Sequence, residues 1–236
     1  MAVQALYEIK TLIAPQHRLA LPLVRWRSRR GHGEAVTRDT EIVIEGYPRS
    51  GSNFAVAAFQ LAQPTPVKIA HHTHAPANVI AAVRLGIPTM VLIREPEDSV
   101  LSLLIREPSL SLSQALRGYL RFYEPLLPYR DGFVVGPFGE VTTDYGSVIR
   151  RINERFGSAF TEFAHTPQNV EACFRTIEEH YRSLDRSRQV ELAIPRPSAD
   201  RDRIKETLHA AYRSETSVRV RARVQSLYGS LTDGSG

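Results

Sequence analysis

The chain has 236 residues, with 30 Lys and Arg against 25 Asp and Glu and a formal net charge of +5. This length is sufficient for one sizeable core, and we expect one α/β domain. The basic residues are almost all Arg and are interspersed with acids, which disfavours a lysine-rich nucleic-acid-binding tract. No apolar run reaches membrane-spanning length, and one Cys cannot form an internal disulfide, so we expect a cytoplasmic protein without a nucleic-acid partner.

Residues 1–39 are expected to form an N-terminal flap and a basic linker. Apolar residues at helical spacing around Leu6 and Ile9 precede Pro15, and an apolar run covers 19–24. The dense basic cluster at 25–30 contains Trp26 and is interpreted as a solvated segment. A nucleic-acid or membrane-surface patch is the alternative, with peripheral membrane contact through 19–30. One domain is then expected over 40–231, followed by a disordered tail at 232–236.

The stretch 41–54, EIVIEGYPRSGSNF, organises the rest of the chain. Its first five residues have the pattern of a short strand, and a helical pattern starts at Asn53. Between them, Gly46 and Gly51 allow backbone angles that turn successive N–H groups toward an anion at the helix N-terminus. The candidate anion-binding residues are Tyr47, Pro48, Arg49, Ser50, Gly51, Ser52 and Asn53. A tight turn without a ligand is the alternative.

The spacing of Gly46 and Gly51 matches the start of G-x-x-x-x-G-K-[ST], but the end of that motif is missing. Ser52 and Asn53 stand where a nucleoside triphosphatase needs Lys and Ser or Thr. This difference disfavours ordinary ATP hydrolysis. The strong cation of the loop is Arg49, whose guanidinium can donate two hydrogen bonds to phosphate or sulfate oxygens.

A second anion motif follows a buried strand predicted at 89–93. The strand ends in Arg94, and a helix begins with Pro96 in its first turn. An Arg that leaves the carboxyl end of a strand and a hydroxyl two helical turns later, here Ser102, can converge on one anion.

Three histidines follow another predicted strand, at 66–70, in the segment His71–Pro76. No Asp, Glu or Cys joins them at ligand spacing, so we expect no metal site, although zinc remains an alternative together with plain surface histidines. An imidazole has a pKa suited to a general base, and His74 and His72 are the candidates for catalysis.

The three motifs together resemble those of sulfotransferases that use 3′-phosphoadenosine 5′-phosphosulfate (PAPS). YPRSGSN resembles their 5′-phosphosulfate loop, and Arg94 to Ser102 fits Arg-x-Pro-x-Asp-x-x-x-Ser, whose Arg and Ser hold the 3′-phosphate. The run at 72–76 resembles Lys-Thr-His-x-Pro, whose His is the base. The resemblance implies that His74 is the base and that Arg49 and His72 contact the phosphosulfate. It also implies that no metal is needed. His72 departs from the usual Lys.

Strands and helices alternate through 41–157, which predicts an α/β fold with three layers, α/β/α, and a central parallel sheet of the P-loop-like, sulfotransferase type. A last strand is predicted at 132–138 and a helix at 145–156. Tyr119 and Tyr123 lie on a predicted helix, where core packing is expected and contact with an acceptor is the alternative. The late segment 194–203 carries Arg196 and Arg201 at a place comparable to the basic loop that sulfotransferases close over the cofactor, although their usual Arg-Lys-Gly run is absent. Ordinary surface arginines are the alternative.

The sequence therefore predicts a PAPS-dependent sulfotransferase. It would move the sulfuryl group to a hydroxyl or amine of a small-molecule or carbohydrate acceptor and release 3′,5′-diphosphoadenosine (PAP). Two alternatives remain at this stage: a phosphotransferase with a degenerate P-loop, and a non-catalytic module that binds an adenosine nucleotide. The sequence does not name the acceptor or the oligomeric state.

Overall fold

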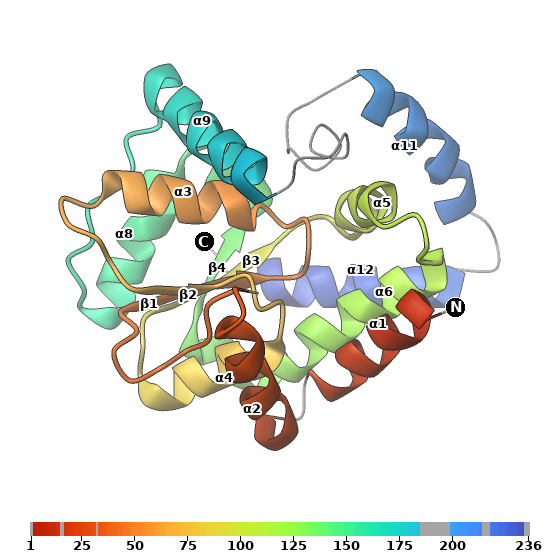
Figure 1. Ribbon diagram of the computed structural model, residues 1–236, viewed down its shortest axis with the longest axis horizontal. Coiled ribbons are helices and arrows are strands. Elements are labelled where there is room, and N and C mark those ends of the chain that lie inside the picture. Colours follow the sequence, from red (N-terminus) through yellow and green to blue (C-terminus); the bar gives the residue numbers. More distant parts are fainter. Residues whose placement is uncertain (1, 15–16, 32, 185–198, 214–217, 234–236) are drawn as a thin grey trace.

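The computed structural model describes residues 2–14, 17–31, 33–184, 199–213 and 218–233. Its centre is a four-stranded parallel sheet with the strand order β2-β1-β3-β4 (Figure 1). The strands are β1 (Ile42–Gly46), β2 (Ile69–His71), β3 (Thr89–Ile93) and β4 (Val134–Pro137). In the register of the sheet, Val43 lies between Ala70 of β2 and Thr89 of β3. The strands therefore all end at the same edge.

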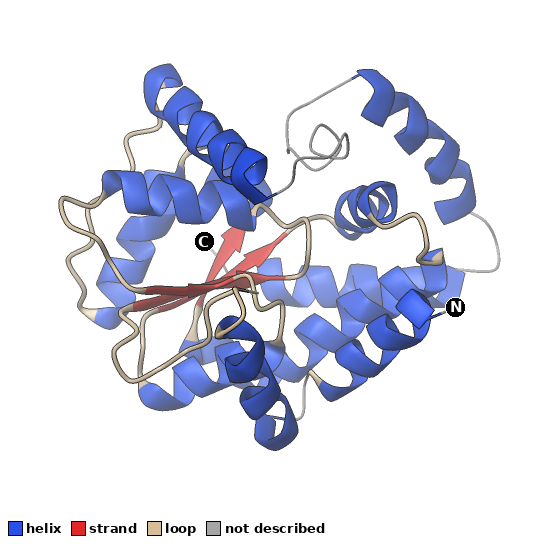
Figure 2. Cartoon of the chain, in the orientation of Figure 1, coloured by secondary structure: helices blue, strands red, loops and turns tan. Residues whose placement is uncertain are grey.

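Helices cover both faces of the sheet, which explains why β1 and β3 are buried along their whole length (Figure 2). Side chains alternate between the faces: Ile44 and Leu92 belong to one hydrophobic cluster, whereas Val91 and Ile93 belong to the other. The first cluster packs against α3 (Ser52–Ala62), α7 (Phe138–Thr143), α8 (Tyr145–Phe156) and α9 (Pro167–Leu184). The second packs against α4 (Pro76–Leu85), α5 (Pro96–Arg106), α6 (Leu112–Tyr123), the 3₁₀-helix η1 (Glu124–Gly132), α11 (Ala199–Tyr212) and α12 (Val218–Thr232). The predicted three-layer α/β/α fold is confirmed.

Most predicted elements are present with small shifts of their ends. The strand at 89–93 is confirmed as β3, whereas the strand predicted at 66–70 begins later, at Ile69. The N-cap of helix α6 is Ser111, whose side chain accepts a hydrogen bond from the Gln114 N–H in a capping box. The sequence did not predict the short helix α7, which follows β4 directly.

The N-terminal segment forms two helices, α1 (Ala2–Ile13) and α2 (His17–Ser28). Helix α2 continues through residues 25–28 of the basic cluster, with Pro22 in its interior. Helix α1 packs against α6, and α2 packs against α4. The predicted disordered tail is described only to Asp233, and Thr232 is the last residue of α12.

A helix that crosses a membrane needs about 20 mostly apolar residues in succession. Within the described residues, no helix is long and apolar enough to cross a membrane.

Candidate active site

The three sequence motifs lie at one edge of the sheet, because each follows the carboxyl end of a neighbouring strand. The chain moves from β1 outward to β2 and then returns past β1 to β3, so the direction of winding reverses between β1 and β3. Crevices at such switch points are the usual ligand sites of parallel sheets. Gly46 at the end of β1 lies so close to β3 that a Cβ would come within 2.8 Å of the Leu92 carbonyl oxygen. Glycine is therefore required where the first loop starts.

The loop between β1 and α3 presents unpaired polar groups to this crevice. Arg49 has φ of 73° and Gly51 has φ of 95°, two left-handed residues that reverse the chain before the helix. Among the described residues, no acceptor meets the backbone N–H groups of Gly51, Ser52 and Asn53. The hydroxyl of Ser52 is buried and also has no partner in this part of the chain. Such donors at the N-terminus of a helix suit an anion.

A tyrosine from α6 holds this loop in place. The Tyr123 hydroxyl donates to the Leu92 carbonyl at 2.7 Å and accepts from the Tyr47 N–H at 3.3 Å, and the Ser50 hydroxyl lies 3.3 Å from it. Tyr119 donates from the same helix to the Arg94 carbonyl at 3.0 Å. Both rings are fully buried, so the predicted core packing is confirmed. The sequence did not indicate that their hydroxyls fix two anion loops.

The two predicted anion motifs meet at their arginines. The Arg49 Nε donates to the Ser102 hydroxyl at 2.9 Å, and the Arg94 guanidinium donates to the Arg49 carbonyl at 3.3 Å. Arg94 also lies 3.7 Å from Asp98 and stacks 4.1 Å from the ring centre of Phe138. Two guanidinium groups and a buried hydroxyl are thus brought to the crevice beside the free N–H groups.

His74 has one ring nitrogen fixed by the backbone. Its Nδ1 lies 2.8 Å from the Gly46 carbonyl oxygen, which can only accept, so Nδ1 carries the proton and Nε2 keeps its lone pair. The pKa of His74 is lowered to about 4, chiefly by burial; the bond to the Gly46 carbonyl opposes this shift, and the charges of Lys10 and Arg106 add to it. The imidazole is therefore neutral at neutral pH, the form in which a base accepts a proton.

A buried carboxylate holds the His74 loop. Glu45 of β1 is fully buried and accepts from the Thr73 N–H at 2.8 Å, the Thr73 hydroxyl at 2.5 Å, the His74 N–H at 3.2 Å and the Asn78 amide at 3.3 Å. Burial raises the pKa of Glu45, although these four bonds lower it. Asn78 in turn accepts from the Val36 N–H at 2.8 Å. The signal in the sequence was an acidic residue inside an otherwise apolar strand.

His72 is bound on both sides. Its Nε2 lies 2.6 Å from the side-chain oxygen Oδ1 of Asn53, and its Nδ1 lies 2.6 Å from the His71 Nδ1. The Asn53 oxygen accepts, so His72 donates from Nε2 and accepts from His71 at Nδ1. Asn53 also donates to the Tyr181 hydroxyl of α9 at 2.7 Å. Burial lowers the pKa of His72 well below its usual value, so this chain of hydrogen bonds is neutral.

Arg196 and the side chain of Arg201 lie outside the described residues, as does most of the late segment 194–203. Within the part of the chain that the structure describes, no group of three or more His, Cys, Asp or Glu side chains could hold a metal ion.

Comparison with known proteins finds a likeness among solved structures. No family model matches the chain, and no curated protein matches it. Among solved structures, the chain is similar to mouse sulfotransferase SULT7A1 complexed with PAP, with 10% sequence identity and a TM-score of 0.42. The likeness covers 80% of this chain and 90% of that chain.

Proposed function

We propose that the protein is a PAPS-dependent sulfotransferase. The observation that carries this proposal is the pairing of two features at one sheet edge. An anion cradle made by the N–H groups of 51–53, Arg49 and Arg94 faces the same crevice as the loop of a neutral histidine, His74, whose Nε2 is not held by the backbone. An enzyme that moves an anionic group to a hydroxyl needs both features.

The residues of the chain fit the donor through their unpaired groups. The free N–H groups and the buried Ser52 hydroxyl suit the 5′-phosphosulfate. Tyr47 and Ser50 of the same loop are held by Tyr123, and together with Pro48 they remain proposed contacts. Arg94 and Ser102 are assigned to the 3′-phosphate. Because Arg49 donates to Ser102 in this structure, donor binding would exchange that bond for one to a donor oxygen. Arg196 and Arg201 remain proposed contacts.

In the proposed reaction His74 Nε2 takes the proton of the acceptor hydroxyl or amine, while Nδ1 stays bound to the Gly46 carbonyl. When bound, PAPS supplies the sulfuryl group: the bond from sulfur to the acceptor forms as the bond to the 5′-phosphate oxygen breaks, and PAP leaves with that electron pair. Arg49 stabilises the charge on the phosphosulfate. His72 remains a proposed contact of the sulfuryl oxygens, for which its Nε2–H would leave the Asn53 oxygen.

The proposal is tested by transfer of radiolabelled sulfuryl from PAPS to a mixture of hydroxyl and amine acceptors, in the presence and absence of EDTA. We expect labelled product in both cases, because the loop uses Arg49 and N–H groups where a nucleoside triphosphatase uses Lys and a metal. Activity that EDTA abolishes and magnesium restores would favour the phosphotransferase alternative. Donor binding without any labelled product would favour the non-catalytic module.

A further inference from the structure

The two N-terminal helices, α1 and α2, carry large apolar side chains on the outside of the molecule. These side chains and their exposed fractions are Leu6 (66%), Ile9 (54%), Leu12 (53%), Leu23 (42%) and Trp26 (49%). They are half of the ten large apolar side chains that are exposed among the described residues, although the two helices are a small part of the chain. Single exposed apolar residues are ordinary, whereas a cluster marks a surface that binds a partner.

The side of α1 that faces the protein is held by polar contacts. The Glu8 carboxylate forms ion pairs with two arginines of α6. Leu6, Ile9 and Leu12 follow one another at intervals of three residues and are exposed, so they form an apolar stripe that points away from the protein. An ordinary surface helix has the opposite arrangement, with its apolar side toward the core.

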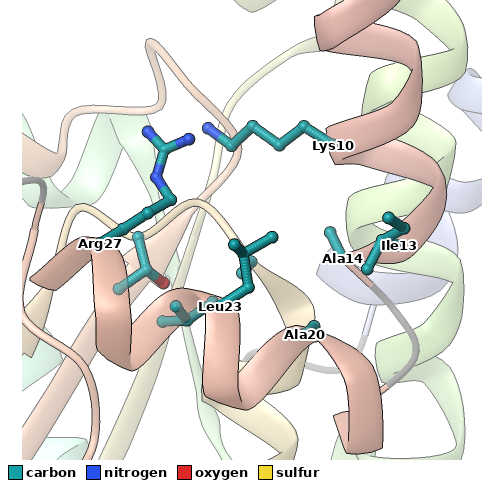
Figure 3. Close-up of a pocket in the computed structure, with 9 residues that line it drawn as sticks. Lys10, Ile13, Ala14, Ala20, Leu23 and Arg27 are labelled. Carbon is teal, nitrogen blue, oxygen red and sulfur yellow. The ribbon is translucent and has the colours of Figure 1, made fainter.

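The apolar stripes of the two helices flank one gap. Figure 3 shows Ile13 of α1 and Leu23 of α2 on facing walls of the small pocket between the helices. Ile13 lies one turn beyond Ile9 on α1, and Trp26 lies one turn beyond Leu23 on α2. The two stripes therefore belong to one surface. We call it the N-terminal face, and it consists of Leu6, Ile9, Leu12, Leu23 and Trp26.

The positive charge of the chain is concentrated in the same segment. Six of the 30 basic residues and one of the 25 acidic residues lie at positions 1–30, so the rest of the chain carries 24 of each. The formal net charge of +5 therefore comes wholly from this segment. Arg25, Arg29 and Arg30 are exposed, and the Arg30 guanidinium stacks 3.9 Å from the centre of the Trp26 ring. The N-terminal face thus has a cationic border on α2.

This combination of apolar and cationic groups selects among partners. A second copy of the chain brings the same positive charges to the contact, which disfavours self-association. A nucleic acid pairs with the arginines but leaves Leu6, Ile9 and Leu12 in water. An anionic lipid bilayer suits both kinds of group, because its headgroups attract the arginines and its acyl chains bury the apolar side chains.

We propose that the N-terminal face docks on the surface of a membrane that contains anionic phospholipids. Helices α1 and α2 lie in the plane of the interface, with their apolar stripes toward the acyl chains. The Ala77 N–H at the start of α4 donates to the Ala14 carbonyl at the end of α1 at 3.2 Å, so the domain is tied to the docked helices. Docking of this kind is independent of the sulfotransferase activity proposed above.

Trp26 is the single tryptophan of the chain, so its fluorescence reports directly on this face. We expect its emission to shift to the blue when vesicles of phosphatidylcholine and phosphatidylglycerol are added, and far less with phosphatidylcholine alone. High salt should weaken the shift because it screens the arginines. The double variant Arg25→Gln, Arg29→Gln should lose the preference for anionic vesicles.

The apolar stripe is tested by the double variant Leu6→Gln, Ile9→Gln in co-sedimentation with the anionic vesicles. We expect its binding to be weaker by at least about tenfold, because two apolar side chains are no longer buried in the interface. The matched control is Leu61→Gln, Leu85→Gln, which changes two leucines of similar exposure, 48% and 52%, on α3 and α4. The control should bind vesicles like the wild type. Circular dichroism checks that each variant is folded.

Four outcomes would overturn the proposal. The first is that the wild type binds neither kind of vesicle or binds both equally, and the second is that the control loses as much affinity as the Leu6 and Ile9 variant. The third is a dimer in sedimentation equilibrium that the Leu6 and Ile9 variant dissociates, because a second copy would then cover the face. The fourth is a single-stranded oligonucleotide that shifts the Trp26 emission when anionic vesicles do not.

Discussion

The two loops on either side of the candidate active site are supported by different chemistry. The β1–α3 loop, which presents the proposed anion cradle, is held by the neutral hydroxyl of Tyr123 from a distant helix. The β2–α4 loop, which carries His74, is held by the carboxylate of Glu45 from the neighbouring strand. We call these two supporting side chains, Tyr123 and Glu45, the hubs of their loops. Both are buried, and each binds several backbone groups.

The difference has an energetic consequence. A carboxylate that accepts four hydrogen bonds in a buried place forms stronger bonds than a phenol, and its removal leaves more donors unsatisfied. A neutral hub beside the anion cradle adds no negative charge that would repel a phosphate. The Glu45 carboxylate lies instead beside the loop of the proposed base, His74. The variants below change one loop at a time.

The largest expected effect concerns His74 on the Glu45-supported loop. His74→Ala should lower kcat by roughly 10²–10⁴-fold, the usual contribution of a positioned general base, with donor affinity nearly unchanged. Single-turnover kinetics measure the chemical step without product release. His72→Ala is the comparison variant. If His72 contacts the phosphosulfate, this variant should bind the donor more weakly and also turn over more slowly. Full activity of His74→Ala would show that another group is the base.

Glu45→Gln should disrupt the same loop without touching the base. The amide keeps one accepting oxygen but places an NH2 where the other carboxylate oxygen accepts, so the His74 N–H, or else the Thr73 and Asn78 donors, would face another donor. We therefore expect the free energy of unfolding to fall by about 2–4 kcal/mol. Urea denaturation measures this change. The exposed Glu41, at the start of the same strand, provides the control Glu41→Gln, for which about 1 kcal/mol or less is expected. Equal losses would contradict the role assigned to the Glu45 hub.

The pH dependence follows from the low pKa of His71 and of His74, each about 4 in the folded protein against a usual value of 6.5. The unfolded chain takes up these protons first as the pH falls, so stability should be lost between about pH 6.5 and 4. The kcat/KM should stay level from pH 8 to about 5, because His74 remains neutral. Activity that halves near pH 6.5, while circular dichroism shows an intact fold, would contradict a base with this pKa.

Tyr123→Phe should give a smaller effect on the other loop. It removes one hydroxyl and leaves the Tyr47 N–H without its acceptor, which should lower the free energy of unfolding by about 1–3 kcal/mol and weaken donor binding several-fold. Tyr119→Phe, which loses a single bond to the Arg94 carbonyl, should cost less. If the Tyr119 variant binds the donor more weakly than the Tyr123 variant, then Tyr123 is not the main support of the β1–α3 loop.

The sequence predicted the local parts of this site and missed the supports between them. Arg94 and Ser102 were identified because they lie in one strand–helix segment with fixed spacing, and His74 because it follows a strand. The contact between Tyr123 and Ser50 joins positions 73 residues apart, and no periodic pattern reports such a pair. Which nitrogen of His74 carries the proton follows from its contact with the Gly46 carbonyl oxygen, so the sequence alone could not predict it.

The central claim is that Arg94 and Ser102 recognise a 3′-phosphate, and nucleotide selectivity tests it most directly. Isothermal titration calorimetry with PAP and with 5′-AMP compares two ligands that differ by that phosphate. We expect PAP to bind roughly ten- to a hundredfold more tightly, since each charge-assisted bond contributes about 1.5–3 kcal/mol. Arg94→Ala should weaken PAP and leave 5′-AMP nearly unchanged. Equal affinity of the wild-type protein for the two nucleotides would contradict the assignment.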